Sequence, residues 1–109
     1  MKRISYRFQG YTKLNQLPAE LDNEVARYVL DQLVARKILD EHYQASGLSW
    51  SKRGYLARCI GQNFGISHVW KVMGDFWHCN SRSLRSGYNK SLDCGMLGEF
   101  MDDIRDLMR

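Results

Sequence analysis

The chain has a single proline among its 109 residues and no apolar run long enough to span a bilayer. Its three cysteines and three histidines contain no C-x-x-C or H-x-x-x-H pair, which are the spacings typical of zinc sites. It also has no Gly-rich phosphate loop, no G-x-S-x-G sequence and no pair of carboxylates within an apolar segment. These absences predict a protein that is not an enzyme and has no metal or cofactor.

A secretory signal is also missing from the sequence. Met1-Lys2-Arg3 is followed by Ile-Ser-Tyr-Arg-Phe rather than by an apolar stretch. The odd number of cysteines favours reduced thiols over a disulfide framework. We therefore expect a cytoplasmic protein that does not enter a membrane.

Hydrophobic residues make up 44% of the chain and charged residues 26%, both close to the average of soluble globular proteins. A chain of this length can bury one ordinary hydrophobic core without disulfides or metals. We expect a single domain, residues 1–109, of the mainly α class. The expected architecture is a bundle of about four helices with one minor β element.

The positive charge is distributed unevenly along the chain, whose formal net charge is +4. Residues 46–92 have seven basic residues and one acidic residue, whereas residues 17–45 and residues 93–109 each have a net charge of −3. Residues 1–16 add four basic residues. Such a pattern indicates a protein with one anion-facing side, a domain whose own segments attract one another, or a head-to-tail dimer.

Residues 3–9 alternate between polar and apolar side chains. The apolar ones are Ile4, Tyr6 and Phe8. A period of two with aromatic and β-branched residues predicts a half-buried strand. Its pairing partner stays open, because residues 84–88, residues 48–50 and the same strand of a second subunit could each supply one.

Residues 18 to about 40 have a long helical pattern, with Pro18 suited to the first turn. We expect this helix to be the central packing element, because its apolar residues form two adjacent rows. Across the whole chain, the predicted core residues are Val25, Val29, Leu33, Ile60, Val72, Phe76, Phe100 and Ile104.

Residues 51–64 and residues 68–79 predict two short helices joined by a tight turn. Gly65 is expected at the left-handed end of the first helix, and Ser67 is expected to cap the second. The pair, residues 51–79, resembles the helix-turn-helix of DNA-binding proteins. An ordinary helical hairpin within the core is the alternative.

The resemblance is incomplete at the second helix. The usual pattern would bury Lys71 and Gly74, whereas the apolar residues of this helix are offset from that frame. No base-contacting residue is therefore assigned from the resemblance.

Residues 80–90 contain turn-forming residues, mainly serine and asparagine, and have no periodicity, which predicts a loop or a wing. Residues 97–108 again have a helical apolar stripe, with acidic residues on the opposite face.

Basic residues in the middle of the chain are interleaved with aromatic residues. Cations neutralise phosphates, and aromatic rings can stack on unpaired bases. The candidate nucleic-acid-binding residues are Lys52, Arg53, Arg58, Lys71, Arg82 and Arg85. Trp70 and Tyr88 are candidate partner-binding residues, because aromatic residues are frequent in interfaces.

The leading hypothesis is a non-enzymatic nucleic-acid-binding or regulatory accessory protein that contacts phosphates through residues 51–90. The alternative is a small protein-binding adaptor, inhibitor or immunity-type protein that acts on an acidic partner surface. A homodimer is also expected to be feasible, because a lone edge strand and an acidic helix both favour partners.

Overall fold

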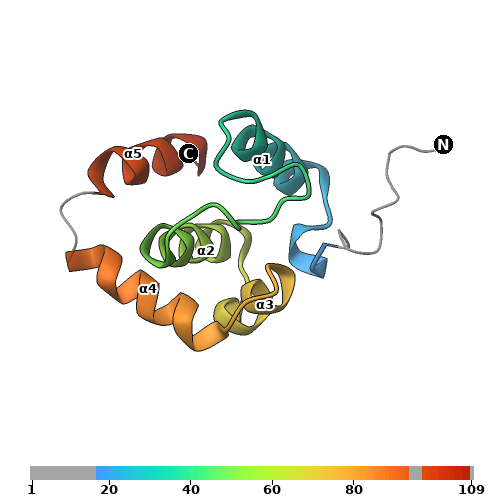
Figure 1. The fold of residues 1–109 in the computed structure, drawn as a ribbon. Helices are drawn as coiled ribbons and strands as arrows, with labels where there is room; N and C mark the ends of the chain where they lie inside the picture. The colour runs from blue at the N-terminus through green and yellow to red at the C-terminus, as the bar shows by residue number, and fades with distance from the viewer. Residues whose placement is uncertain (1–16, 94–96, 109) are drawn as a thin grey trace.

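Helix α2 (Trp50–Phe64) runs through the middle of the molecule, and the other helices are arranged on two sides of it (Figure 1). The computed structural model describes residues 17–93 and 97–108. On one side lie α1 (Glu24–Ala35) and α5 (Gly98–Met108), and on the other lie α3 (Val69–Phe76) and α4 (Ser81–Asp93). The mainly helical class is confirmed, with five α-helices and no strand among the described residues. The prediction of about four helices was too low.

The core forms where these helices meet around α2. Its residues come from every helix and from the loops between them, and the largest fully buried side chains are Leu21, Leu30, Leu33, Leu56, Ile60, Met73, Leu84 and Ile104. Of the predicted core residues, Val29, Leu33, Ile60, Phe76 and Ile104 are buried. Val72 and Phe100 are half-buried and pack against the core from its edge.

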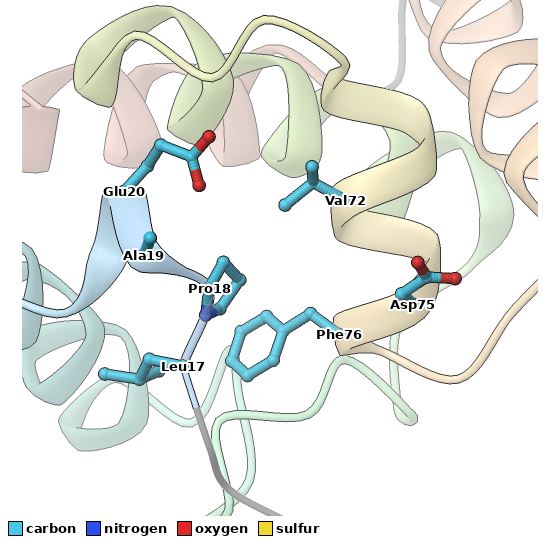
Figure 2. A pocket seen from close by; sticks show the side chains of 7 residues that line it. All are labelled: Leu17, Pro18, Ala19, Glu20, Val72, Asp75 and Phe76. Atoms are coloured by element: carbon cyan, nitrogen blue, oxygen red, sulfur yellow. The ribbon is translucent and has the colours of Figure 1, made fainter.

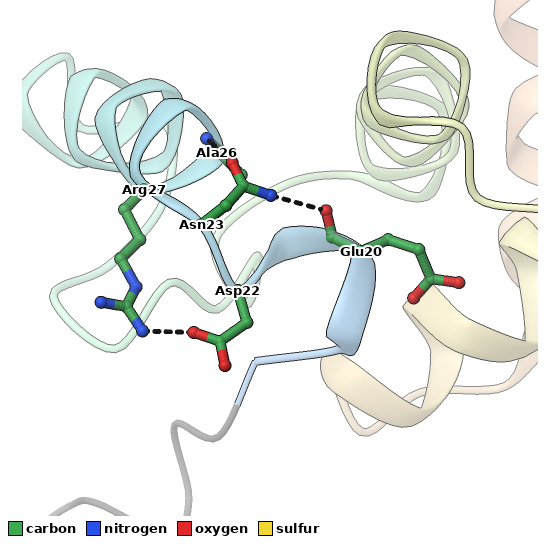
Figure 3. Close-up of polar contacts among 5 residues, drawn as sticks. All are labelled: Glu20, Asp22, Asn23, Ala26 and Arg27. Carbon is green, nitrogen blue, oxygen red and sulfur yellow. Dashed lines mark hydrogen bonds and ion pairs between the residues drawn. The ribbon is translucent and has the colours of Figure 1, made fainter.

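The single long helix predicted for residues 18 to about 40 is wrong. A 3-10 turn, η2 (Ala19–Leu21), comes first and is separated from α1 by a break at Asp22 and Asn23. Asn23 causes this break, because its Oδ1 accepts the Ala26 N–H at 2.9 Å and its Nδ2 donates to the Glu20 carbonyl at 3.1 Å (Figure 3). An asparagine with these bonds stabilises a helix start rather than a helix interior.

Helix α1 also ends earlier than predicted, at Ala35, and Lys37 adopts a left-handed φ of 62° in the turn that follows. Val25 was predicted to be a core residue, but its side chain is 68% exposed. The buried stripe of α1 centres on Ala26 and Leu33, and Val25 lies about a quarter turn from that centre. It therefore falls just outside the face that α1 buries.

The loop after α1 is fixed to α3 by two bonds to backbone carbonyls. Trp77 Nε1 donates to the Tyr43 carbonyl at 2.9 Å, and Gln44 Nε2 donates to the Phe76 carbonyl at 3.0 Å. Because both partners are backbone atoms in part-buried positions, these bonds hold the loop and the end of α3 in one arrangement.

The two helices predicted for residues 51–79 are confirmed as α2 and α3. Gly65 ends α2 with φ 67° and ψ 38°, the left-handed conformation expected of it. The predicted cap at Ser67 is wrong, because His68 occupies the N-cap position of α3 and its side chain makes no capping bond.

The loop predicted for residues 80–90 is a helix. Asn80 starts α4 by accepting the Ser83 N–H at 3.1 Å through its Oδ1. On α4, Gly87 leaves no room for a side chain, since an added Cβ would lie 2.6 Å from the Trp50 carbonyl carbon of α2. Gly54 of α2 is equally close to α4, because a Cβ there would lie 2.9 Å from the Gly87 carbonyl carbon. The glycines thus let the two backbones touch.

The predicted strand at residues 3–9 lies outside the described residues. The segments considered as its partners within the chain are not strands, because residues 84–88 belong to α4 and residues 48–50 lead into α2.

Candidate nucleic-acid interface

Helix α4 has one buried face and one exposed face. Leu84, Gly87 and Ser91 face α2 and are buried. The exposed side chains of its outer face are Arg82, Arg85, Ser86, Asn89, Lys90 and Asp93. Within residues 17–93 and 97–108, the side chains of Arg82, Arg85, Asn89 and Lys90 make no hydrogen bond or ion pair. Among the described residues, the solvent side of the helix therefore has three cations without an ion-pair partner, together with one carboxylate, Asp93.

The position of Arg82 on α4 is electrostatically unfavourable for the protein itself. It lies in the first turn, which contains no acidic residue, and the helix dipole is positive at that end. Arg85 lies three residues further on the same surface, so the two guanidinium groups also repel each other. Neither charge is placed where it would stabilise the helix.

The aromatic pair Trp70 and Tyr88 lies where three helices meet. Their ring centroids are 5.7 Å apart, and the guanidinium carbon of Arg58 lies 5.7 Å from the Tyr88 centroid. All three side chains are half-buried. Since they belong to α2, α3 and α4, their contacts join α4 to its two neighbours.

Arg53 and Lys52, at the start of α2, are engaged within the molecule. Arg53 donates from Nη2 to the Leu48 carbonyl at 2.9 Å and lies 4.4 Å above the Trp50 ring. The Lys52 ammonium lies 5.4 Å from the Phe100 centroid, which places it beside α5. Both cations therefore have contacts within the molecule, unlike those on the outer face of α4.

Lys71 on α3 is exposed, but its ammonium is 3.3 Å from the Asp75 carboxylate one turn later. An i, i+4 pair of this kind is weak in water, yet it offsets the local charge. Of the six cations that the sequence indicated, Arg82 and Arg85 are brought together on one helix. Arg58 contacts the Tyr88 ring of α4, whereas Lys52, Arg53 and Lys71 contact residues outside α4.

The opposite side of the molecule is acidic. Helix α5 has four carboxylates and one arginine, and α1 with its flanking residues is also rich in carboxylates. Because α5 lies across α2 from α4 (Figure 1), the carboxylates of α5 and the cations of α4 belong to helices on different sides of α2.

A groove of about 450 Å³ lies between η2 and α3. Figure 2 shows Phe76 beside Pro18 and Leu17, which form its apolar part. The charged residues that line it are Glu20 and Asp75, both acidic. The groove therefore does not extend the basic surface.

A second hollow of about 380 Å³, between α2 and α5, contains Tyr55, Cys59 and Arg105. Burial raises the pKa of the Cys59 thiol and also that of the Tyr55 phenol. Burial likewise raises the pKa of Cys79, before α4. Thiols with raised pKa values stay protonated near neutral pH, which disfavours nucleophilic chemistry at either cysteine.

No three side chains of histidine, cysteine, aspartate or glutamate converge as metal ligands among the residues that the structure describes. Within the same residues, every helix is too short or too polar to cross a bilayer.

The sequence prediction missed Asn89 and did not place Lys90 on a helix. One signal could have found them, namely the four-residue spacing of small residues at Ser83, Gly87 and Ser91. Small residues at this spacing mark a helix face that packs closely on another helix, and they leave the intervening polar residues outside.

Together, the fold and the charge distribution of the described residues define a small, mainly helical protein with exposed cations on α4. No protein-family model matches the chain, and no curated protein or solved structure matches it significantly. The functional argument therefore depends on the geometry of α4 and its neighbours.

Proposed function

We propose that the protein is a non-enzymatic nucleic-acid-binding accessory protein and that α4 is its phosphate-contacting surface. The observation that carries this proposal is the set of exposed cations on α4, Arg82, Arg85 and Lys90, without a carboxylate partner in the described part of the chain. Lysine and arginine that neutralise phosphates release condensed counterions, which is the main source of affinity for a polyanion.

The unfavourable electrostatic position of two of these cations within the protein supports the proposal. Arg82 opposes the helix dipole and lies close to Arg85, so solubility alone could be achieved with acidic residues at lower cost. The cluster of Arg58, Trp70 and Tyr88 fixes the helix behind them. A helix that is held rigidly while its cations stay free is suited to contact a regular array of phosphates.

Charge reversal on α4 tests the proposal. The double variant R82E/R85E should bind a short labelled DNA duplex at least roughly tenfold more weakly than the unaltered protein at about 50 mM salt, as measured by fluorescence anisotropy. The matched control is R36E/K37E, which makes the same charge change at exposed positions after α1. The absence of any binding at low salt, or equal losses in the two variants, would contradict the proposal.

A protein partner with an acidic surface is the second candidate, and exposed Leu92 favours it. The Leu92 side chain is 61% exposed and lies one turn after Tyr88 on α4, which adds an apolar residue to a basic surface. Interfaces between proteins combine apolar and charged residues in this way. In this case a protein would be captured after nuclease treatment, and L92D would abolish its capture without changing the affinity for nucleic acid.

A further inference from the structure

We infer that α4 enters the major groove of duplex DNA and that Arg85 and Asn89 read base edges there. This inference depends on the proposed function, because it assigns the nucleic acid and the mode of contact to the same helix. Three features of the described residues carry it: the exposure of α4, the burial of α3, and the chemistry of the outer side chains of α4.

Helix α4 has the size and position that insertion requires. It is 13 residues long, or about 20 Å at the usual helical rise, and it lies at the periphery of the molecule (Figure 1). The major groove is about 12 Å wide, which admits a helix with its side chains. On the inner side, Gly54 and Gly87 bring the α4 backbone against α2, so the helix is supported along its buried face.

The second helix of the predicted helix-turn-helix, α3, is less suitable. It has only eight residues, and Val69, Met73, Gly74 and Phe76 among them are buried. Its exposed cation, Lys71, is paired with Asp75. The helix that can enter a groove is therefore the one that follows the predicted pair.

The outer residues of α4 match the chemistry of base edges. Arg82, Arg85 and Asn89 lie at i, i+3 and i+7, so they share one helix face, which Asp93 ends with a carboxylate in the last turn. Arginine can donate two hydrogen bonds to the O6 and N7 atoms of guanine, and asparagine can pair with the N6 and N7 atoms of adenine. Arg82 and Lys90, nearer the two ends of the helix, are placed to contact the flanking phosphates.

The environment of Tyr88, the aromatic residue of α4, favours duplex DNA over a single strand as the ligand of this helix. The Tyr88 ring contacts both Trp70 and Arg58, so its ring is engaged within the protein rather than free to stack on an unpaired base. Duplex RNA is disfavoured because its deep and narrow major groove does not admit side chains for base reading.

The test is selection of binding sites from a randomised DNA duplex library, followed by anisotropy titrations of the enriched site and its scrambled sequence. The unaltered protein should prefer the enriched site by at least tenfold. The R85K variant keeps the charge but loses the guanidinium group, which can donate two parallel hydrogen bonds, and N89A removes the side-chain amide. In each variant, the preference for the selected base pair over the others at one position of the site should fall roughly 5- to 150-fold. Their affinity for the scrambled duplex should stay within about twofold.

Matched controls are R36K and N63A, exposed positions outside α4, which should leave the preference unchanged. Low-salt binding to duplexes with no enriched sequence would overturn this inference while leaving the proposed phosphate contact intact. Preference for single strands, or an enriched site whose recognition survives both R85K and N89A, would also overturn it. Failure to bind any nucleic acid would overturn the proposed function as well.

Discussion

Helices α4 and α5 both pack on α2, but they do so by different means. Helix α5 uses large side chains. Ile104 is fully buried, and the Phe100 ring packs edge to face on the Tyr55 ring, with 6.3 Å between the ring centroids. Helix α4 uses Leu84 together with glycine and serine, so that its backbone touches that of α2. We therefore expect the position of α4 on α2 to be more tightly constrained than that of α5. Where two backbones touch, no side chain can adjust to a shift of the helix.

The two helices also differ in how their charges are placed relative to the helix dipole. In α5, Glu99 lies in the first turn and Arg105 in the last, as the helix dipole favours, and Arg105 is 3.3 Å from Asp102. In α4, Arg82 lies in the first turn and its charge has no partner among the described residues. Lys90, in the last turn of α4, also suits the helix dipole, so the contrast with α5 rests on Arg82 and its neighbour Arg85. These two charges are the reason why we propose a contact outside the protein.

The largest expected effect comes from filling the close crossing on α4. G87A should lower the free energy of unfolding by about 4 kcal/mol, because the added Cβ overlaps the Trp50 carbonyl and the helices must separate. G98A, at the start of α5, meets nothing within 4 Å and should be neutral or slightly stabilising. Urea denaturation of both variants measures the difference, and equal effects would show that the crossing is not tight.

A core truncation on α5 should separate stability from binding. I104A removes a fully buried side chain and should cost about 3 kcal/mol in the free energy of unfolding. Its affinity for a DNA duplex, measured at a temperature where the variant is still folded, should be unchanged. A loss of affinity in folded I104A would mean that α5 takes part in binding.

Removing the cap of α4 should have a moderate effect. N80A eliminates the Oδ1 that accepts the Ser83 N–H and should cost about 1 kcal/mol. The equivalent change at the start of α1, N23A, provides the comparison, because Asn23 accepts the Ala26 N–H in the same way. Thermal denaturation followed by circular dichroism would show whether the two caps contribute alike, and no loss in N80A would contradict the helix start.

The smallest expected effect is a gain in stability from a substitution on α4. R82E places an acidic residue in the first turn of α4 and replaces the repulsion of Arg85 by attraction, so it should stabilise the protein by about 0.5 kcal/mol. The same variant should bind DNA more weakly. Destabilisation by R82E, measured by denaturant unfolding, would show that Arg82 has a structural role.

Sequence patterns were sufficient for α2 and α5, whose apolar residues recur at helical spacing. They were also sufficient for Gly65, since a glycine after the last apolar residue commonly ends a helix. These elements bury large side chains, which is the signal that periodicity detects. In α1 the same signal was misleading, because the bonds of Asn23 break the helix after Leu21 and leave Val25 outside the buried stripe.

Helix α4 could not be recognised by its composition. Serine, asparagine and glycine have low helix propensity, and in an isolated peptide they favour turns. Contact with α2 reverses this preference, since only small residues such as Gly87 permit the close crossing. The sequence did indicate the cations Arg82 and Arg85, but their alignment on one exposed helix face depends on that packing.

The salt dependence of DNA-duplex binding tests the central claim most directly. We would compare the unaltered protein with R82A/R85A/K90A and with a control, R36A/K37A, between about 50 and 200 mM salt. If α4 contacts phosphates or base edges through these cations, the slope of log K against log salt should become shallower by about two to three in the triple variant and stay unchanged in the control. An unchanged slope in the triple variant, or no binding by the unaltered protein at low salt, would contradict the account.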